Sequence, residues 1–148
     1  MINGHTELIA HIGYPTHAFK APMIYNPYFE HIGVNACVVP MGCRSPDYPA
    51  FLRAVFTLDN IRGALITMPH KVATVGLLDR ASPTVAVAGA CNAVRRAADG
   101  TLERVRPALG AKLATLGYLF PALRRVTQPL LERRGRAAKA RHRKHIPR

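Results

Sequence analysis

The chain has no tryptophan, only three cysteines and only eight acidic residues among its 148 positions. The odd number of cysteines and the lack of any C-x-x-C spacing argue against a disulfide framework and against a zinc site. We expect Cys37, Cys43 and Cys91 to be reduced and packed as small hydrophobic side chains, as in a cytoplasmic protein. The seven histidines are scattered, with no helical ligand spacing beside a carboxylate, so we expect no metal site.

Long hydrophobic runs are also missing. The longest apolar stretch in the C-terminal part, residues 113–123, is 11 residues long and contains a glycine and a proline. A helix needs about 20 apolar residues to cross a bilayer. Residues 1–7 contain no basic group that leads into an apolar segment. We therefore expect neither a membrane span nor a secretory signal.

Acidic residues are nearly absent from the last part of the chain. Residues 1–103 carry eight basic and seven acidic side chains, whereas residues 104–148 carry thirteen basic side chains and one acidic one, Glu132. The net charge is therefore +1 in the first segment and +12 in the second. We predict a domain over residues 1–103 and a basic tail over residues 104–148. Three interpretations of the tail stay open: a shifted reading frame, a disordered extension, or a segment that binds nucleic acid or an anionic surface.

Short apolar runs alternate with helical patterns along residues 1–103. Strands are predicted over residues 8–12, 36–39 and 63–67, and a hairpin over residues 94–103 around Asp99-Gly100. Helices are predicted from Pro22 to a stop at Gly33, over residues 47–56 with Asp47 as the cap, and over residues 71–78. Pro27 is acceptable only if it falls in the first helical turn. This order favours an α/β layered domain with a mainly parallel sheet flanked by helices.

Three polar residues lie where such a sheet binds ligands, next to the carboxyl ends of its strands. Thr67 ends the strand over 63–67, Lys71 follows it, and Asn92 precedes the hairpin. Lysine is a mobile proton donor or acceptor, and threonine and asparagine orient hydroxyl groups. The alternatives are a surface lysine, a strand threonine that bonds to backbone and an asparagine that forms a turn.

Four short segments occur in a characteristic order: Gly13-Tyr14-Pro15, Lys20-Ala21-Pro22 with Asn26, the segment from Gly63 to Lys71, and Gly89-Ala90-Cys91-Asn92. Their order and spacing resemble the N-terminal, substrate-binding domain of the shikimate dehydrogenase family, which has the patterns G-x-P-x-x-H-S-x-S-P-x-x-x-N, G-x-N-V-T-x-P-x-K and G-A-x-N-T. The resemblance covers residues 7–103, roughly two thirds of the chain.

The resemblance implies a cytoplasmic, NADP-dependent oxidoreductase of aromatic amino acid biosynthesis that oxidises a cyclic polyol to a ketone. It implies that Lys71 is the catalytic lysine and that Thr67 and Asn92 bind substrate hydroxyls. Asn92 and Thr67 are therefore the substrate-binding candidates. We expect no cofactor-binding residue in this chain.

The chain also departs from the family pattern. Phe19 and Ala21 stand where the family has the two serines that hold the substrate carboxylate, and Ala18 stands at the preceding histidine. Either the substrate lacks that carboxylate or another group replaces the serines, with Thr16, His17 and Tyr25 as candidates. Leu65 stands at the family's asparagine, a change that we interpret as structural.

The family's loop with a partner aspartate and its dinucleotide-binding domain have no counterpart after residue 103, where neither an aspartate nor G-x-G-x-x-G occurs. We therefore expect a substrate-binding domain that binds no NADP and is inactive alone. Its exposed domain interface would favour association. The alternative function is that of a non-enzymatic basic protein that binds nucleic acid or an anionic surface through residues 104–148.

Overall fold

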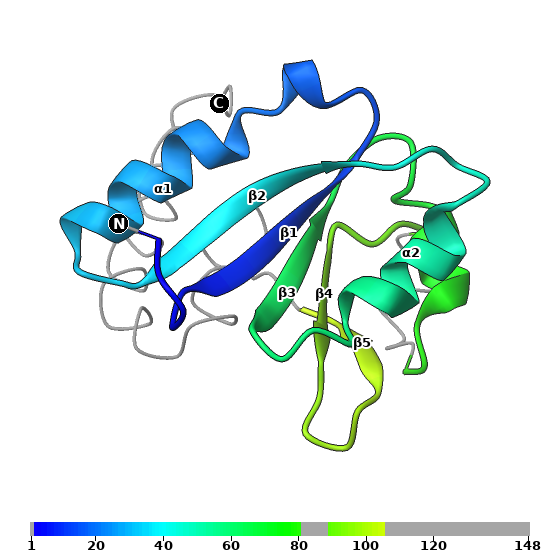
Figure 1. The fold of residues 1–148 in the computed structure, drawn as a ribbon. Coiled ribbons are helices and arrows are strands. Elements are labelled where there is room, and N and C mark those ends of the chain that lie inside the picture. The colour runs from blue at the N-terminus through cyan, green and yellow to red at the C-terminus, as the bar shows by residue number, and fades with distance from the viewer. Residues whose placement is uncertain (1, 81–88, 106–148) are drawn as a thin grey trace, which may run out of the picture. The chain divides into compact units, whose positions relative to one another are not determined.

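The computed structural model describes residues 2–80 and 89–105, and Met1–Arg104 forms a compact unit (Figure 1). Its strands form a five-stranded sheet in the order β2-β1-β3-β4-β5. These strands are β1 (Glu7–Gly13), β2 (Ala36–Gly42), β3 (Ile61–Ile66), β4 (Ala93–Arg96) and β5 (Leu102–Arg104). The first three run parallel, and β4 and β5 form an antiparallel hairpin beside β3. The predicted α/β fold is confirmed, with a mixed sheet whose centre is parallel.

Two α-helices and two 3₁₀ helices connect the strands. They are α1 (Ala21–His31), α2 (Tyr48–Val55), η1 (Thr16–Ala18) and η2 (Ala73–Leu77). In Figure 1, α1 runs beside β2, whereas α2 lies near the hairpin side of the sheet. Within the two described ranges, no helix is long and apolar enough to cross a membrane.

The main core lies between α2 and the sheet. The α2 side chains Tyr48 and Leu52 are fully buried, and they belong to one cluster with alternate residues of the strands, including Ala10, Ile12 and Ile66. Because side chains alternate across a strand, Ile9 and its register partner Val38 point to the opposite face, where α1 packs against β2. The central strands are therefore covered on both faces, as their apolar runs predict.

Three details differ from the sequence predictions. Pro27 lies in the middle of α1, and the requirement that it fall in the first turn is wrong. Its position is exposed, so the backbone carbonyl that loses its helical partner can bond to water. Asp47 occupies the cap of α2 but makes no side-chain capping bond. The helix expected over 71–78 is the shorter 3₁₀ helix η2.

Beyond Val105, the predicted basic tail lies outside the described residues, so its boundary at residue 104 stays a prediction.

Candidate functional site

The candidate site lies at the carboxyl ends of β1 and β3. The Thr67 N–H donates to the Ile12 carbonyl at 2.9 Å, which extends the β1–β3 pairing one residue beyond β3. The Tyr14 N–H then donates to the Met68 carbonyl at 3.0 Å, so the turns that follow the two strands lie side by side. This edge is where parallel sheets gather ligands.

The segment before β4 reaches the same edge because β4 is antiparallel to β3. The Ile66 N–H donates to the Asn92 carbonyl at 2.9 Å, and the Cys91 N–H donates to the Lys71 carbonyl at 2.8 Å. These two bonds hold Asn92 beside the end of β3 and hold Lys71 beside Cys91. The three residues predicted for the site therefore meet at one edge, although Asn92 and Thr67 are far apart in sequence.

Their side chains are available to a ligand. Lys71 and Thr67 are partly exposed and Asn92 is exposed. Among the described residues, no hydrogen bond or ion pair engages the Lys71 ammonium, the Thr67 hydroxyl or the Asn92 amide. The three groups can donate to ligand hydroxyls, and the threonine and asparagine can also accept from them.

Gly13 allows β1 and the turn after β3 to approach closely. A Cβ atom at Gly13 would lie 2.4 Å from Thr67 Cγ2 and 2.7 Å from the Met68 carbonyl oxygen. Both distances are shorter than a carbon can tolerate, so only glycine fits here without a backbone shift.

The aromatic ring of Phe19 also lies beside Gly13. Phe19 Cζ would lie 3.0 Å from a Gly13 Cβ, and the Phe19 ring packs on His11 with 4.2 Å between centroids. Phe19 thus presents an apolar ring beside Thr67. Of the three donors considered as substitutes for serines, Thr16 and His17 lie in η1 and are not buried, whereas Tyr25 is 3% exposed. Burial raises the pKa of the Tyr25 hydroxyl.

A buried polar cluster supports the Lys71 backbone, and sequence reasoning missed it. His70 is 1% exposed, its Nε2 lies 2.8 Å from the Cys43 carbonyl oxygen, and its ring stacks on Tyr48 at 4.0 Å. The Thr74 hydroxyl donates to the His70 carbonyl at 2.7 Å, and the Tyr48 hydroxyl lies 2.6 Å from the same threonine oxygen. Because the Thr74 hydroxyl proton is donated to the His70 carbonyl, the Tyr48 hydroxyl is the donor in its bond to Thr74.

This cluster fixes the residue that precedes Lys71 from two sides, through the turn after β2 and through α2. Burial raises the pKa of Tyr48 to about 12, so its hydroxyl stays protonated at neutral pH. In the sequence, only the four-residue spacing between His70 and Thr74, which flank Lys71, could have indicated this buried cluster.

Arg44 and three apolar side chains line the outer rim of the site. The Arg44 guanidinium lies 4.5 Å from the centroid of the Tyr14 ring and donates to the Tyr14 hydroxyl at 2.8 Å. Tyr14, Met68 and Val72 are 42%, 66% and 70% exposed. The rim thus combines a cation with an exposed apolar surface.

The cysteines take no part in this chemistry. Cys43 and Cys91 are buried and belong to the main core, and all three cysteines are free. Burial raises the pKa of both buried thiols, so neither is a thiolate at neutral pH. Within residues 2–80 and 89–105, no group of histidine, cysteine and acidic side chains could hold a metal ion.

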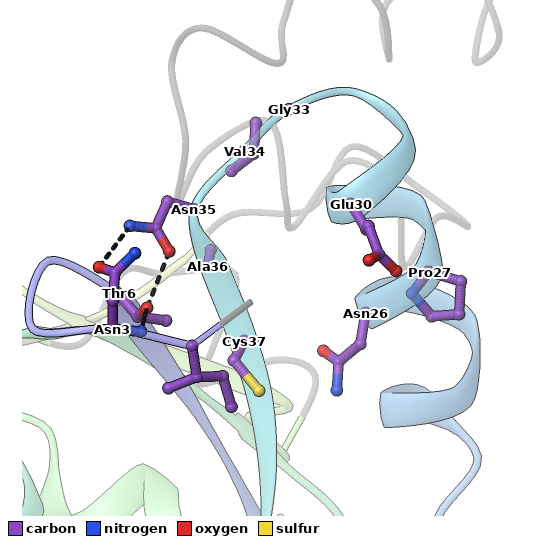
Figure 2. Close-up of a pocket in the computed structure, with 11 residues that line it drawn as sticks. Asn3, Thr6, Asn26, Pro27, Glu30, Gly33, Val34, Asn35, Ala36 and Cys37 are labelled. Atoms are coloured by element: carbon purple, nitrogen blue, oxygen red, sulfur yellow. Dashed lines mark hydrogen bonds between the residues drawn. The ribbon is translucent and has the colours of Figure 1, made fainter.

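A cavity of about 660 Å³ lies at the other end of the sheet, where β1 and β2 begin (Figure 2). Its polar side chains are largely occupied with one another. The Thr6 hydroxyl donates to Asn35 Oδ1 at 2.8 Å, and Asn35 Nδ2 donates to Asn3 Oδ1 at 3.2 Å. Figure 2 shows Asn26 and Glu30 on the α1 side of the cavity. The bonded amides leave few groups for a ligand, so the polar residues at the carboxyl edge remain the candidate site.

Comparison with known proteins decides the family. Residues 11–94, more than half of the chain, match the shikimate dehydrogenase substrate binding domain. The chain belongs to the shikimate dehydrogenase family. Among curated relatives, the NADP(+) shikimate dehydrogenase of Pelobacter propionicus is 38% identical over 81 residues, which cover 55% of this chain and 29% of that protein. The enzyme of Geobacter metallireducens is 34% identical over 98 residues, covering 66% and 34%.

Solved structures of the family share the fold. The shikimate 5-dehydrogenase of Listeria monocytogenes, in complex with shikimate and NAD, superimposes with a TM-score of 0.63 at 29% identity and covers 70% of this chain and 35% of that one. The enzyme of Thermus thermophilus, in complex with NADP(H) and shikimate, gives a TM-score of 0.59 at 26% identity, covering 66% and 36%. The chain thus spans about a third of the length of the relatives it matches.

Proposed function

We propose that this chain is the substrate-binding domain of a shikimate-dehydrogenase-like oxidoreductase, whose complete reaction is the NADP-dependent oxidation of a cyclic polyol to a ketone. The observation that carries the proposal is the meeting of Thr67, Lys71 and Asn92 at one edge of the sheet through backbone bonds. Membership of the family, whose curated relatives are NADP(+) shikimate dehydrogenases, supports it.

In this proposal Lys71 is the catalytic residue. When a hydride leaves the carbon of an alcohol, the oxygen must lose its proton. An amine or ammonium beside that oxygen can relay the proton or stabilise the developing negative charge. Thr67 and Asn92 would orient neighbouring hydroxyls, so that the reacting carbon faces the hydride acceptor. NADP would supply that acceptor from outside the described residues.

The apolar ring of Phe19 makes a carboxylate-bearing substrate unfavourable in this chain. The ring lies beside Thr67, and Ala21, at the other position that corresponds to a family serine, is buried and has no side-chain donor. Two missing hydrogen bonds to a charged group would each weaken binding by about 1.5–3 kcal/mol. We therefore infer a neutral polyol as the substrate class.

The proposal is tested by ligand binding to the full chain, measured by calorimetry with shikimate and its neutral methyl ester. We expect the ester to bind more tightly than shikimate. Thr67→Val and Asn92→Leu should each weaken ester binding by about 0.5–1.5 kcal/mol, because each removes a hydrogen bond to a hydroxyl. Leu58→Ala, a change at an exposed residue outside the site, is the control.

The carboxylate argument has a separate test. The double variant Phe19→Ser/Ala21→Ser should gain affinity for shikimate by about tenfold or more, since 1.4 kcal/mol corresponds to a factor of ten. Its affinity for the methyl ester should change little. Equal binding of both ligands by the wild-type chain would contradict the inferred substrate class, and no binding of either would contradict the site itself.

A further inference from the structure

Asn26 belongs to one of the segments that carry the resemblance to the family. It lies in α1, however, and takes no part in the candidate site. Its side chain contacts the backbone of β2 instead. The Val38 N–H donates to Asn26 Oδ1 at 2.7 Å, and Asn26 Nδ2 donates to the Val38 carbonyl at 3.1 Å. One amide side chain thus makes the two bonds that a residue of a neighbouring strand would make.

Val38 lies in an edge strand, since β2 is the first strand of the sheet among the described residues. The Glu7 N–H donates to the Asn35 carbonyl, and the Cys43 N–H donates to the Gly13 carbonyl, so residues with odd numbers in this strand face β1. In a parallel pair, the intervening residues turn their N–H and C=O groups away from the partner. The outward positions of β2 are therefore 36, 38, 40 and 42.

Three of these four outward positions offer no N–H group to another strand. The Ala36 N–H already donates to the Val34 carbonyl at 2.9 Å. The Val38 N–H is bonded to Asn26. Pro40 has no N–H group. An exposed strand edge is a template for pairing with another chain, and proteins close such edges with proline or with covering side chains.

We propose that the Asn26 side chain closes the β2 edge against strand addition by a second copy of this chain. The Ala36 N–H is taken by the Val34 carbonyl and Pro40 has no N–H group, so the Val38 N–H is the outward donor in the middle of β2 that depends on a side chain. Removal of the Asn26 amide exposes the N–H and carbonyl groups of Val38. The β2 edge of a second copy carries the same two groups and can pair with them.

The test compares Asn26→Leu with Asn60→Leu in the full chain by sedimentation equilibrium. Asn60 is the matched control, because its Nδ2 also donates to a backbone carbonyl, that of Thr6 at 3.1 Å, away from the β2 edge. Asn26→Leu should raise the self-association constant about tenfold over wild type, the factor that corresponds to about 1.4 kcal/mol. Asn60→Leu should leave it unchanged. Equal association of the two variants would overturn the proposal, because general destabilisation would then explain both.

Amide hydrogen exchange at Val38 gives an independent readout. In wild type this amide should be protected at every protein concentration. In Asn26→Leu it should exchange rapidly in dilute solution and regain protection as the concentration rises. In Asn26→Asp the carboxylate still accepts from the Val38 N–H, so protection should persist without association. Rapid exchange of the Val38 amide in wild type would overturn the proposal even if the leucine variant does not fold.

Discussion

At the scale of single residues, Gly13 shows how closely the site depends on the sheet. The turns after β1 and β3 approach each other at the one position where β1 carries no side chain. The polar group of Thr67 is thereby fixed relative to β1, and a ligand at this edge meets a preformed surface. Any side chain at position 13 must displace either Thr67 or the backbone at Met68.

Gly13→Ala should therefore destabilise the domain by about 1–3 kcal/mol, the usual cost of inserting a carbon into a packed region. Gly76→Ala is the control, because a Cβ there meets nothing within 4 Å. Alanine at position 76 should have little effect or stabilise by about 0.4–1 kcal/mol, since it restricts the unfolded chain. Urea unfolding of both variants measures the difference, and equal midpoints would contradict the close approach at Gly13.

The Asp79 carboxylate predicts a pH dependence. A hydrogen bond from Arg53, and a second from the Leu102 N–H, lower the pKa of Asp79 below its usual 3.8. The unfolded chain therefore takes up the proton first as the pH falls. The contribution of Asp79 to stability is fully present above about pH 4 and is lost as the pH falls through the lower, folded-state pKa.

Asp79→Asn should accordingly be less stable than wild type at pH 7, and the gap should shrink between pH 4 and pH 2. Guanidinium unfolding at a series of pH values measures this gap. Asp59→Asn, at an exposed aspartate with no ion pair among the described residues, is the control, because it removes a carboxylate without removing an ion pair. A gap for Asp79→Asn that is constant down to pH 2 would refute the assignment.

Residue chemistry also sets how much of the site could be predicted from sequence. Lys71 and Thr67 could be named as candidates because they lie at or just after the end of an apolar strand. His70, between them, looks like any polar residue of a loop, and its burial comes from Tyr48 and from the turn at Cys43, both distant in sequence. Sequence periodicity reports local faces, whereas such a cluster exists only once the elements have packed.

At the scale of elements, α2 carries much of the core. Its residues Tyr48, Leu52 and Val55 are buried, and their spacing of four and three residues places them on one face of the helix. The helix lacks a side-chain cap, so packing rather than capping stabilises it.

Leu52→Ala should thus cost about 2–5 kcal/mol, the range for a large aliphatic residue in a fixed core. Leu58→Ala, at a residue 47% exposed, should cost about 0.5 kcal/mol or less. The free energies of unfolding of the two variants, measured in urea, make the comparison. Similar values for both would mean that the α2 face is not packed as described.

The elements themselves were predicted where local signals are strong. The three parallel strands read as short apolar runs, and Asp99-Gly100 marks the hairpin turn. The misjudged details, Pro27 within α1 and the short η2 after Lys71, depend on solvent exposure and on the tertiary bonds of the Thr74 region. Local propensity does not encode either.

At the scale of the whole molecule, the chain is about a third of the length of its relatives. We predict that residues 1–148 alone show no NADP-dependent oxidation of shikimate or of neutral polyols, because hydride transfer needs a bound acceptor and the sequence after residue 103 carries no G-x-G-x-x-G. The absorbance of NADPH at stoichiometric protein concentration is the measurement. Measurable turnover would contradict the prediction, and ligand binding without turnover would agree with it.

The alternative function rests on the charge of residues 104–148 and makes a different prediction. A net charge of +12 there would retain DNA with an affinity that falls steeply with salt concentration. Under the proposed function, deletion of residues 104–148 leaves polyol binding unchanged. DNA retention at physiological salt that this deletion abolishes would favour the basic binding protein.

The antiparallel direction of β4 has a consequence for folding. It brings Asn92 to the edge where the chain first passed at Gly13, so the site is assembled from the first and the fourth of the five described strands. Contacts between such distant segments form late, because closing a long loop costs entropy before it gains any bond. A sheet that lacks β1, β3 or β4 does not contain the complete site. Ligand affinity therefore reports whether these three strands have come together.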